Sequence, residues 1–123
     1  MIKMMVVDDS NIIRSKIRRS CDPGQFEVVA TAQDGIDALS KFRRLKPELV
    51  TMDLTMPNMD GIECITSLIN VDPNVQILVI SALSDQDTGI EALECGASGF
   101  LLKPFSEQEL REALEDIKEN LNV

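Results

Sequence analysis

The sequence contains no histidine, tryptophan or tyrosine, and its only cysteines are Cys21, Cys64 and Cys95. Without histidine and without a CxxC pair, the chain lacks the usual ligands of a zinc site. Three widely separated cysteines also do not suggest a disulfide framework, and they suit a reducing compartment. We expect them to be small thiols in the core or at its border.

Long hydrophobic runs are absent as well. No segment approaches the roughly 20 unbroken apolar residues needed to span a bilayer. The opening stretch MIKMMVV has neither the length nor the cleavage site of a signal peptide. We therefore expect a cytoplasmic protein with no membrane partner, folded as one domain over residues 1–123.

Basic residues are in short supply: 12 lysines and arginines face 21 aspartates and glutamates, for a net charge of -9. A strongly acidic chain repels phosphate backbones, so we expect no nucleic-acid partner. Eight of these 12 basic residues gather at 14–19 and 41–46. These clusters suit either two solvated helix faces or a docking surface for an acidic partner.

Five apolar runs recur at similar intervals and predict five strands. They are nearly continuous rather than alternating, as expected for parallel strands that are covered on both faces. The runs are MMVVD (4–8), EVVATA (27–32), ELVTMD (48–53), VQILVIS (75–81) and SGFLLK (98–103).

A helical pattern follows each run. The predicted helix starts are Ser10, Asp34, Asp60, Ser84 and Ser106, the last in a capping box with Glu109. The fourth helix has a weak apolar stripe and contains Gly89, so we expect it to be comparatively mobile. Gly96 is a natural C-cap for it. Five strand–helix units without a linker predict an α/β domain: a doubly wound, five-stranded parallel sheet with five helices.

Charged and polar residues stand where these strands end, the edge at which ligands bind in such sheets. Asp8 and Asp9 end the first strand, Asp53 the third, Ser81 the fourth and Lys103 the fifth. Carboxylates this close repel one another by roughly 1–4 kcal/mol per pair near a surface. A divalent cation removes that conflict, and oxygen ligands without histidine or cysteine favour Mg²⁺, for which Mn²⁺ can substitute.

The same constellation can handle a phosphoryl group. Lys103 can neutralise one of its oxygens, and Ser81 can donate a hydrogen bond to another. Carboxylates form aspartyl-phosphates, and Asp53 is the best candidate nucleophile because it ends the central strand.

Four stretches, in this order, resemble the receiver domain of two-component response regulators: VVDDS (6–10), TMDLTMPNMDGIE (51–63), SA (81–82) and GASGFLLKPF (96–105). The resemblance covers essentially the whole chain and implies a flavodoxin-like fold with strand order 2-1-3-4-5. It implies that Asp53 is the phosphoacceptor and that Asp9 and Asp53 are protein ligands of Mg²⁺. Asp8 would act through a metal-bound water, and the backbone carbonyl of Thr55 would be the third protein ligand.

The resemblance also implies the roles of three residues on the last two strands. Ser81 and Lys103 would contact the phosphoryl group, and the Lys103–Pro104 peptide would be cis. Phe100 stands at the switch position; a plain core phenylalanine is the alternative. In the switch, Ser81 moves toward the phosphoryl group and Phe100 rotates into the vacated space, which repacks the surface of the fourth helix, fifth strand and fifth helix.

We expect a monomer that is not an enzyme in the usual sense, because it catalyses only its own phosphorylation and dephosphorylation. The implied partners are a sensor histidine kinase, an output protein such as the flagellar motor switch, and a phosphatase. The quoted stretches look most like single-domain chemotaxis regulators, so we expect a stand-alone regulator. A phosphorelay intermediate, or a receiver module of a longer response regulator, is the alternative.

Other classes fit less well. A small Mg²⁺-dependent aspartyl-phosphate phosphatase of the haloacid-dehalogenase type usually has a second aspartate two residues after the nucleophile, where this chain has Thr55. A flavodoxin-like carrier lacks its phosphate loop and its aromatic rings, and a P-loop enzyme lacks GxxxxGK[ST]. Thr55 and Leu83 also depart from common receiver patterns and border the route of the hydrolytic water, so we expect them to influence the phosphoryl lifetime.

Overall fold

The computed structural model describes residues 1–54, 60–82 and 86–121. Strands and helices alternate along the chain, and every predicted strand is confirmed to within two residues at either end. The elements are β1 (Ile2–Val7), α1 (Asn11–Ser20), β2 (Phe26–Ala32), α2 (Gly35–Leu45), β3 (Leu49–Asp53), α3 (Gly61–Val71), β4 (Gln76–Ala82), α4 (Gln86–Glu94), β5 (Gly99–Lys103) and α5 (Glu107–Leu121).

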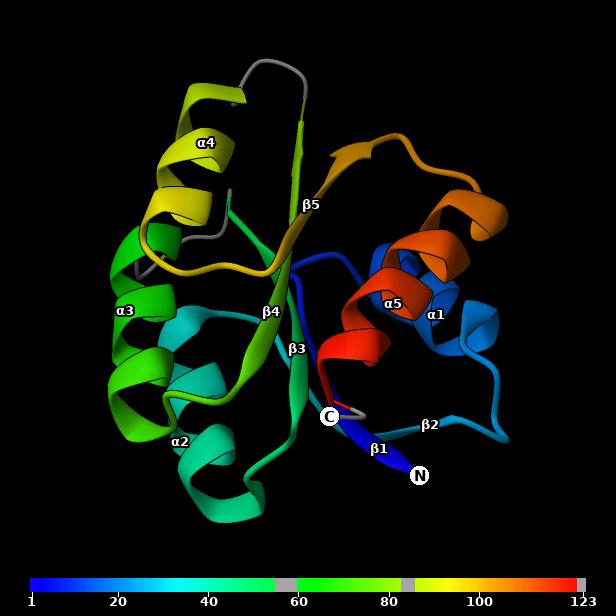
Figure 1. The fold of residues 1–123 in the computed structure, drawn as a ribbon, viewed down its shortest axis with the longest axis horizontal. Coiled ribbons are helices and arrows are strands. Elements are labelled where there is room, and N and C mark those ends of the chain that lie inside the picture. Colours follow the sequence, from blue (N-terminus) through cyan, green and yellow to red (C-terminus); the bar gives the residue numbers. More distant parts are fainter. Residues whose placement is uncertain (55–59, 83–85, 122–123) are drawn as a thin grey trace.

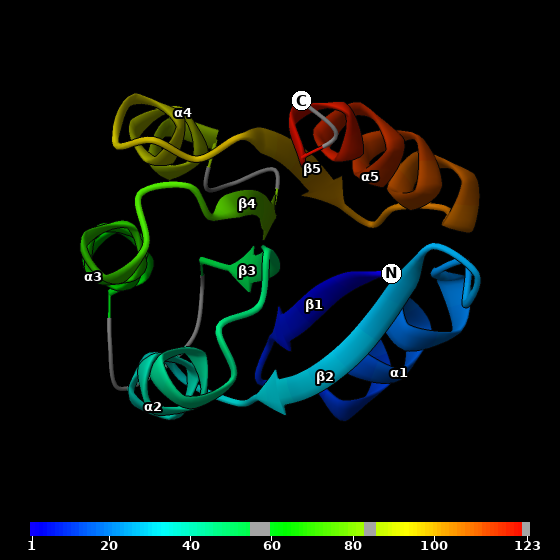
Figure 2. The same cartoon turned by 60° about the horizontal axis from the view of Figure 1, so that its bottom comes forward.

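The five strands form one parallel sheet in the order β2-β1-β3-β4-β5. Helices α1 and α5 cover one face of the sheet, and α2, α3 and α4 cover the other (Figures 1 and 2). The doubly wound, flavodoxin-like fold is therefore confirmed. The order places the ends of β1 and β3 side by side at the centre of one edge, where loops on both faces diverge.

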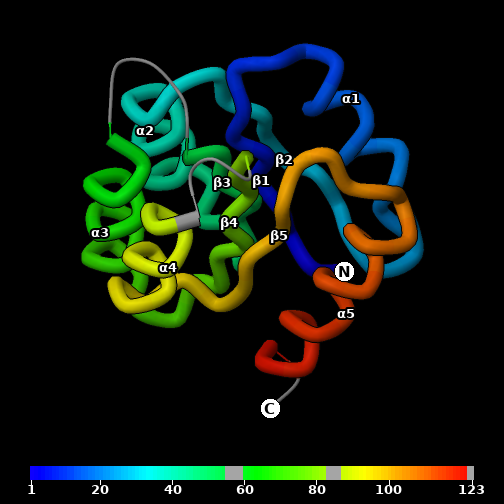
Figure 3. Tube along the Cα trace, turned by 90° about the horizontal axis from the view of Figure 1, so that it is seen from above, coloured from blue at the N-terminus to red at the C-terminus, as the bar shows by residue number. Residues whose placement is uncertain are grey.

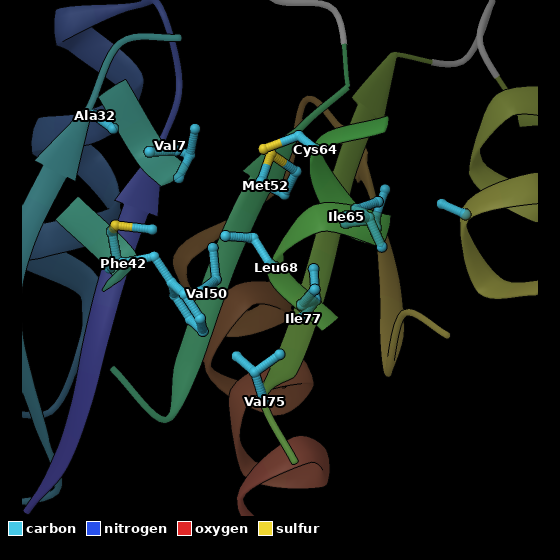
Figure 4. Packing of buried hydrophobic residues seen from close by; sticks show 14 of the residues in the cluster. Val7, Ala32, Phe42, Val50, Met52, Cys64, Ile65, Leu68, Val75 and Ile77 are labelled. Atoms are coloured by element: carbon cyan, nitrogen blue, oxygen red, sulfur yellow. The ribbon is translucent and has the colours of Figure 1, made fainter. Parts of the chain in front are cut away.

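The sheet separates two hydrophobic clusters, which explains why the strand sequences are nearly continuous in apolar residues. On the side of α2–α4, Val7, Val50, Met52 and Ile77 pack against residues of α2 and α3, as Figure 4 shows. The alternate strand residues point to the other face and pack against α1 and α5: Met4, Val6, Leu49, Leu78, Ile80 and Leu101. The inner strands β1, β3 and β4 thus bury both sets of side chains along most of their length, whereas the edge strands β2 and β5 are mostly half-buried.

Side chains cap the helix starts as predicted. Ser10 Oγ accepts a hydrogen bond from the Ile13 N–H at 3.3 Å, and Asp34 Oδ1 accepts from Asp37 at 2.8 Å. Ser106 and Glu109 exchange reciprocal bonds of 3.0 Å, the predicted capping box. Asp60 is also confirmed as a helix start, because it accepts a hydrogen bond from the Ile62 N–H at 2.9 Å. Ser84 lies outside the described residues.

Gly96 closes α4 with a φ of 117°, and its N–H donates to the Leu93 carbonyl at 3.1 Å, so the predicted C-cap is confirmed. Cys95, just before it, corrects one expectation. Cys21 and Cys64 are buried, but Cys95 is exposed, because it lies on the turn that leaves α4 rather than on its inner face. Among the described helices, none combines the length and apolar character required to cross a bilayer.

Candidate functional site

The strand register brings Asp8, Asp53 and Lys103 to one edge of the sheet. Val7 pairs with Met52, so the residues that follow them, Asp8 and Asp53, leave neighbouring strands at the same level. Lys103 is the last residue of β5, beside Ala82 of β4. Figure 3 looks onto this edge, with the strand ends between the two helical layers.

A single ammonium group contacts both buried carboxylates. Lys103 Nζ lies 3.2 Å from Asp8 Oδ2 and 3.4 Å from Asp53 Oδ2. Asp8 and Asp53 are 0% and 1% exposed, whereas the Lys103 side chain keeps 23% of its surface in solvent. Asp9 is exposed, yet one carboxylate oxygen from each of Asp8, Asp9 and Asp53 lies within 4.8 Å of the others. The predicted acidic cluster is confirmed as a spatial group.

The cluster is electrostatically unbalanced. With all three carboxylates ionised, one ammonium leaves a net charge of -2, from three negative charges and one positive. Carboxylates at this separation repel each other by roughly 3–4 kcal/mol per pair near a surface. Burial, the largest cause, raises the pKa of Asp8, and the charge of Asp53 raises it further. The Ser10 N–H, which donates to Asp8 Oδ1 at 2.9 Å, and the Lys103 ammonium act in the opposite direction.

These residues fit a divalent cation. Asp8 Oδ2 is at ion-pair distance from Lys103, but it accepts no well-aligned hydrogen bond from any described residue. A buried carboxylate oxygen that lacks a hydrogen-bond donor and lies beside two further carboxylates is a suitable ligand for a hard cation such as Mg²⁺. Thr55 lies outside the described residues, and the division of roles between Asp8 and Asp9 stays a prediction.

Ser81 borders the cluster from β4. It is fully buried, and it follows Ile80, which pairs with Asp53. Its hydroxyl donates to the Ala82 carbonyl at 3.2 Å. Phe100 pairs with Val79, two residues before Ser81, so the alternation of the sheet places Phe100 and Ser81 on the face covered by α4. The structure thus brings the two predicted switch residues to one face.

Two basic side chains of α1 make contacts in or beside the site that could not be foreseen from the sequence. Arg14 Nη1 donates to the Asp8 carbonyl at 2.5 Å, and the Lys16 ammonium donates to the Phe105 carbonyl. Lys16 Nζ also lies 4.5 Å from the centre of the Phe105 ring, which is consistent with a cation–π contact. Both residues belong to a basic cluster for which the sequence suggested a solvated face or a docking surface.

The peptide between Lys103 and Pro104 is cis, as the resemblance implies. It directly follows the residue that contacts both buried carboxylates, and Phe105 after it is buried between α1 and α5.

Comparison with known proteins agrees with this geometry. The model of the response regulator receiver domain family matches residues 4–115. The chemotaxis protein CheY of Listeria monocytogenes is 38% identical over 115 residues, which cover 94% of this chain and 97% of that protein. A protein-glutamate methylesterase of Methanospirillum hungatei is 35% identical over 98% of this chain, but the match covers only 36% of that protein.

Among solved structures, the receiver domain of the response regulator AraT from Geobacillus stearothermophilus superposes with a TM-score of 0.93. It is 36% identical, and the match covers 98% of this chain and 95% of that one. Sequence motifs, sheet order, acidic cluster and these similarities lead to one conclusion. The chain belongs to the response regulator receiver domain family.

Proposed function

We propose that this chain is a Mg²⁺-dependent phosphoacceptor that receives its phosphoryl group on Asp53 from the phosphohistidine of a sensor kinase. The observation that carries the proposal is the shared contact of Lys103 with Asp8 and Asp53, both buried, beside the exposed Asp9. This arrangement supplies a nucleophile, a cation and oxygen ligands within one small edge of the sheet.

In the transfer step, a carboxylate oxygen of Asp53 attacks the phosphorus. The O–P bond forms as the P–N bond to the kinase histidine breaks, and the leaving nitrogen takes a proton from solvent. Lys103 stabilises negative charge on the phosphoryl oxygens, and the Ser81 hydroxyl donates to another of them. Hydrolysis of the aspartyl-phosphate by water then returns Asp53 to its carboxylate.

Asp8, Asp9 and Asp53 would hold the metal ion. Mg²⁺ supplies positive charge that offsets the repulsion among the carboxylates and the phosphoryl oxygens. The buried Asp8 also orders the start of α1, because its carboxylate accepts from Ser10 and its carbonyl accepts from Arg14. In these steps the chain acts only on itself: it catalyses its own phosphorylation and dephosphorylation.

The output is protein binding, and the similarity to CheY proteins supports a role in chemotaxis with the flagellar motor switch as partner. The surface of α4, β5 and α5 carries large apolar side chains that are free to contact a partner: Ile90 is 57% exposed and Leu93 is 41% exposed. They are three residues apart and share a face of α4.

Intact-mass spectrometry tests the acceptor. We expect the parent chain to gain one phosphoryl group from acetyl phosphate with Mg²⁺, and to gain none when the metal is chelated. Asp53→Asn removes the nucleophilic oxygen and is expected to gain none under either condition. Asp116→Asn on α5 is a matched control, because it makes the same change at an exposed aspartate outside the cluster. A stable adduct on Asp53→Asn would refute the assignment.

The same variants test the output. Immobilised parent chain with beryllofluoride and Mg²⁺ should capture the motor-switch protein more strongly than the chain with Mg²⁺ only. Asp53→Asn should show no such gain. Capture that is equal in all three samples would exclude phosphorylation-dependent binding of this partner.

The methylesterase similarity favours one alternative, in which this sequence is the receiver module of a longer response regulator. The reading frame of the gene downstream of Val123 decides between that alternative and a stand-alone regulator.

A further inference from the structure

The ring of Phe100 lies directly against the backbone of Gly89 on α4. A β-carbon added to Gly89 would lie 1.8 Å from Cε2, 2.6 Å from Cδ2 and 2.7 Å from Cζ of this ring. Carbon atoms in favourable contact stay about 3.5–4.0 Å apart. A side chain at position 89 and the ring in its present place therefore exclude each other.

This contact accounts for a glycine in a helix interior. Glycine is less favourable than alanine there, so its presence needs a reason. The sequence suggested mobility of α4, but Gly89 is buried and the space beside its α-carbon is filled by the aromatic ring. Close approach of the ring explains the glycine without any appeal to mobility.

The ring has an alternative direction on the same sheet face. Phe100 pairs with Val79 on β4, and Ser81 follows two residues later on that face. Rotation about the side-chain bonds of Phe100 can move the ring away from Gly89 without moving β5, because aromatic side chains occupy a few discrete rotamers. Phe100 is half-buried, so its ring is not enclosed on every side.

We propose that Gly89 is the positioning residue for the switch aromatic. Because Gly89 has no side chain, the Phe100 ring can pack directly against α4; we call this ring position the seat. The seat competes with the ring position near Ser81 that phosphorylation favours. Gly89 precedes Ile90, one of the exposed apolar residues of α4, so the ring contacts the helix that carries the output surface. The competition rests on the proposed phosphoacceptor function, whereas the seat itself does not.

A double-mutant cycle tests the seat without any phosphorylation. We expect Gly89→Ala to lower the folding equilibrium constant in the parent background, because the ring is displaced. In the Phe100→Ala background the same change should raise that constant about fivefold, because alanine is the better helix former. Equal effects in the two backgrounds would overturn the proposal. Should Gly89→Ala fail to fold while the double variant folds, the steric exclusion is supported directly.

Nuclear magnetic resonance provides a second readout of the seat. In the parent chain, the α-protons of Gly89 should show cross-peaks to the Phe100 ring, and Gly89→Ala should shift the ring signals strongly. Glu91→Ala, an exposed change on the same helix, is the matched control and should leave the ring signals in place. Ring signals that are unchanged in Gly89→Ala would also overturn the proposal.

Titration with beryllofluoride and Mg²⁺ tests the competition. We expect Gly89→Ala to bind the phosphoryl mimic at least fivefold more tightly than the parent, as a coupling of ordinary size predicts. In the Phe100→Ala background, the added Gly89→Ala should leave the affinity unchanged. Equal affinity of parent and Gly89→Ala overturns the competition. A parent chain that does not bind the mimic overturns the phosphoacceptor function instead, while the double-mutant cycle still decides the seat.

Discussion

Thr51 buries a hydroxyl in the middle of β3. The residue is fully buried, and its Oγ1 has no hydrogen-bond partner among the described residues. A buried polar group in this state costs about 1–3 kcal/mol of desolvation that no bond offsets. The neighbouring buried carboxylate on the strand, Asp53, has Lys103 beside it. The unpaired hydroxyl of Thr51 should therefore lower the stability of the folded chain.

We predict that Thr51→Val raises the free energy of unfolding by about 1 kcal/mol, because valine has nearly the same shape and no hydroxyl. Urea denaturation measures the change. Thr66→Val is the control: Thr66 is exposed and its hydroxyl donates to the Ile62 carbonyl at 3.0 Å, so its effect should stay within about 0.5 kcal/mol. A lower urea midpoint for Thr51→Val would show that the hydroxyl is stabilising.

Among the elements, α2 ends at a residue with a strained backbone conformation. Its C-cap, Lys46, has φ 47° and ψ 58°, the left-handed conformation in which a β-carbon is strained. The Lys46 N–H donates to the Phe42 carbonyl at 2.8 Å, the hydrogen bond that accompanies a left-handed helix end. Pro47 follows and prevents the helix from continuing.

Lys46→Gly should raise the free energy of unfolding by roughly 0.5–1 kcal/mol, because glycine adopts this conformation without strain. Arg44→Gly provides the comparison inside α2 and should lower it by about 1 kcal/mol, since there glycine only adds backbone freedom. Thermal unfolding followed by circular dichroism distinguishes the two. A loss of stability in both variants would mean that the Lys46 side chain contributes more than the strain costs.

Elements could be predicted from the sequence where local chemistry determines them. Apolar runs located the strands, and Ser10, Asp34, Asp60 and Ser106 marked helix starts, because a cap and its N–H partner are two or three residues apart. The acidic cluster was also predictable, since parallel strands put all their carboxyl ends at one edge.

Contacts that depend on how elements pack were not predictable in this way. The local sequence around Gly89 suggests mobility, because nothing in it shows that a ring 11 residues later fills the space beside this glycine. The bond from Lys16 to the Phe105 carbonyl spans 89 positions and depends on the packing of α1 against the start of α5. Such pairs follow only from the three-dimensional arrangement.

For the whole molecule, the net charge of -9 and the cluster of three carboxylates lead us to expect a stability that depends on pH. The folded-state pKa of Asp8 is raised above its ordinary value of 3.8. Between 3.8 and that raised value, the folded chain binds more protons than the unfolded chain, so stability falls as pH rises through this window. Below this window Asp8 costs the folded chain no stability, and above it the loss of stability is complete.

We therefore predict that, without Mg²⁺, the parent chain loses stability relative to Asp8→Asn as the pH rises, by up to roughly 1.4 kcal/mol per pH unit inside the window. The difference between the two urea unfolding profiles reports Asp8 together with its electrostatic coupling to Asp53. At neutral pH, Mg²⁺ at about 100 times its dissociation constant should add about 2.7 kcal/mol to the parent. The gain should be much smaller for Asp8→Asn, and parallel pH profiles would contradict the prediction.

The contrast among the three thiols has a practical consequence. Burial raises the pKa of Cys21 and of Cys64 to about 11, which keeps both protonated and slow to react at neutral pH. Cys95 is exposed on the turn after α4, about two helical turns beyond the Phe100 seat at Gly89. A maleimide dye added to the native chain would therefore attach at Cys95. Without any added cysteine, the chain can thus be labelled with a fluorescent dye at the end of the helix that we expect to respond to phosphorylation.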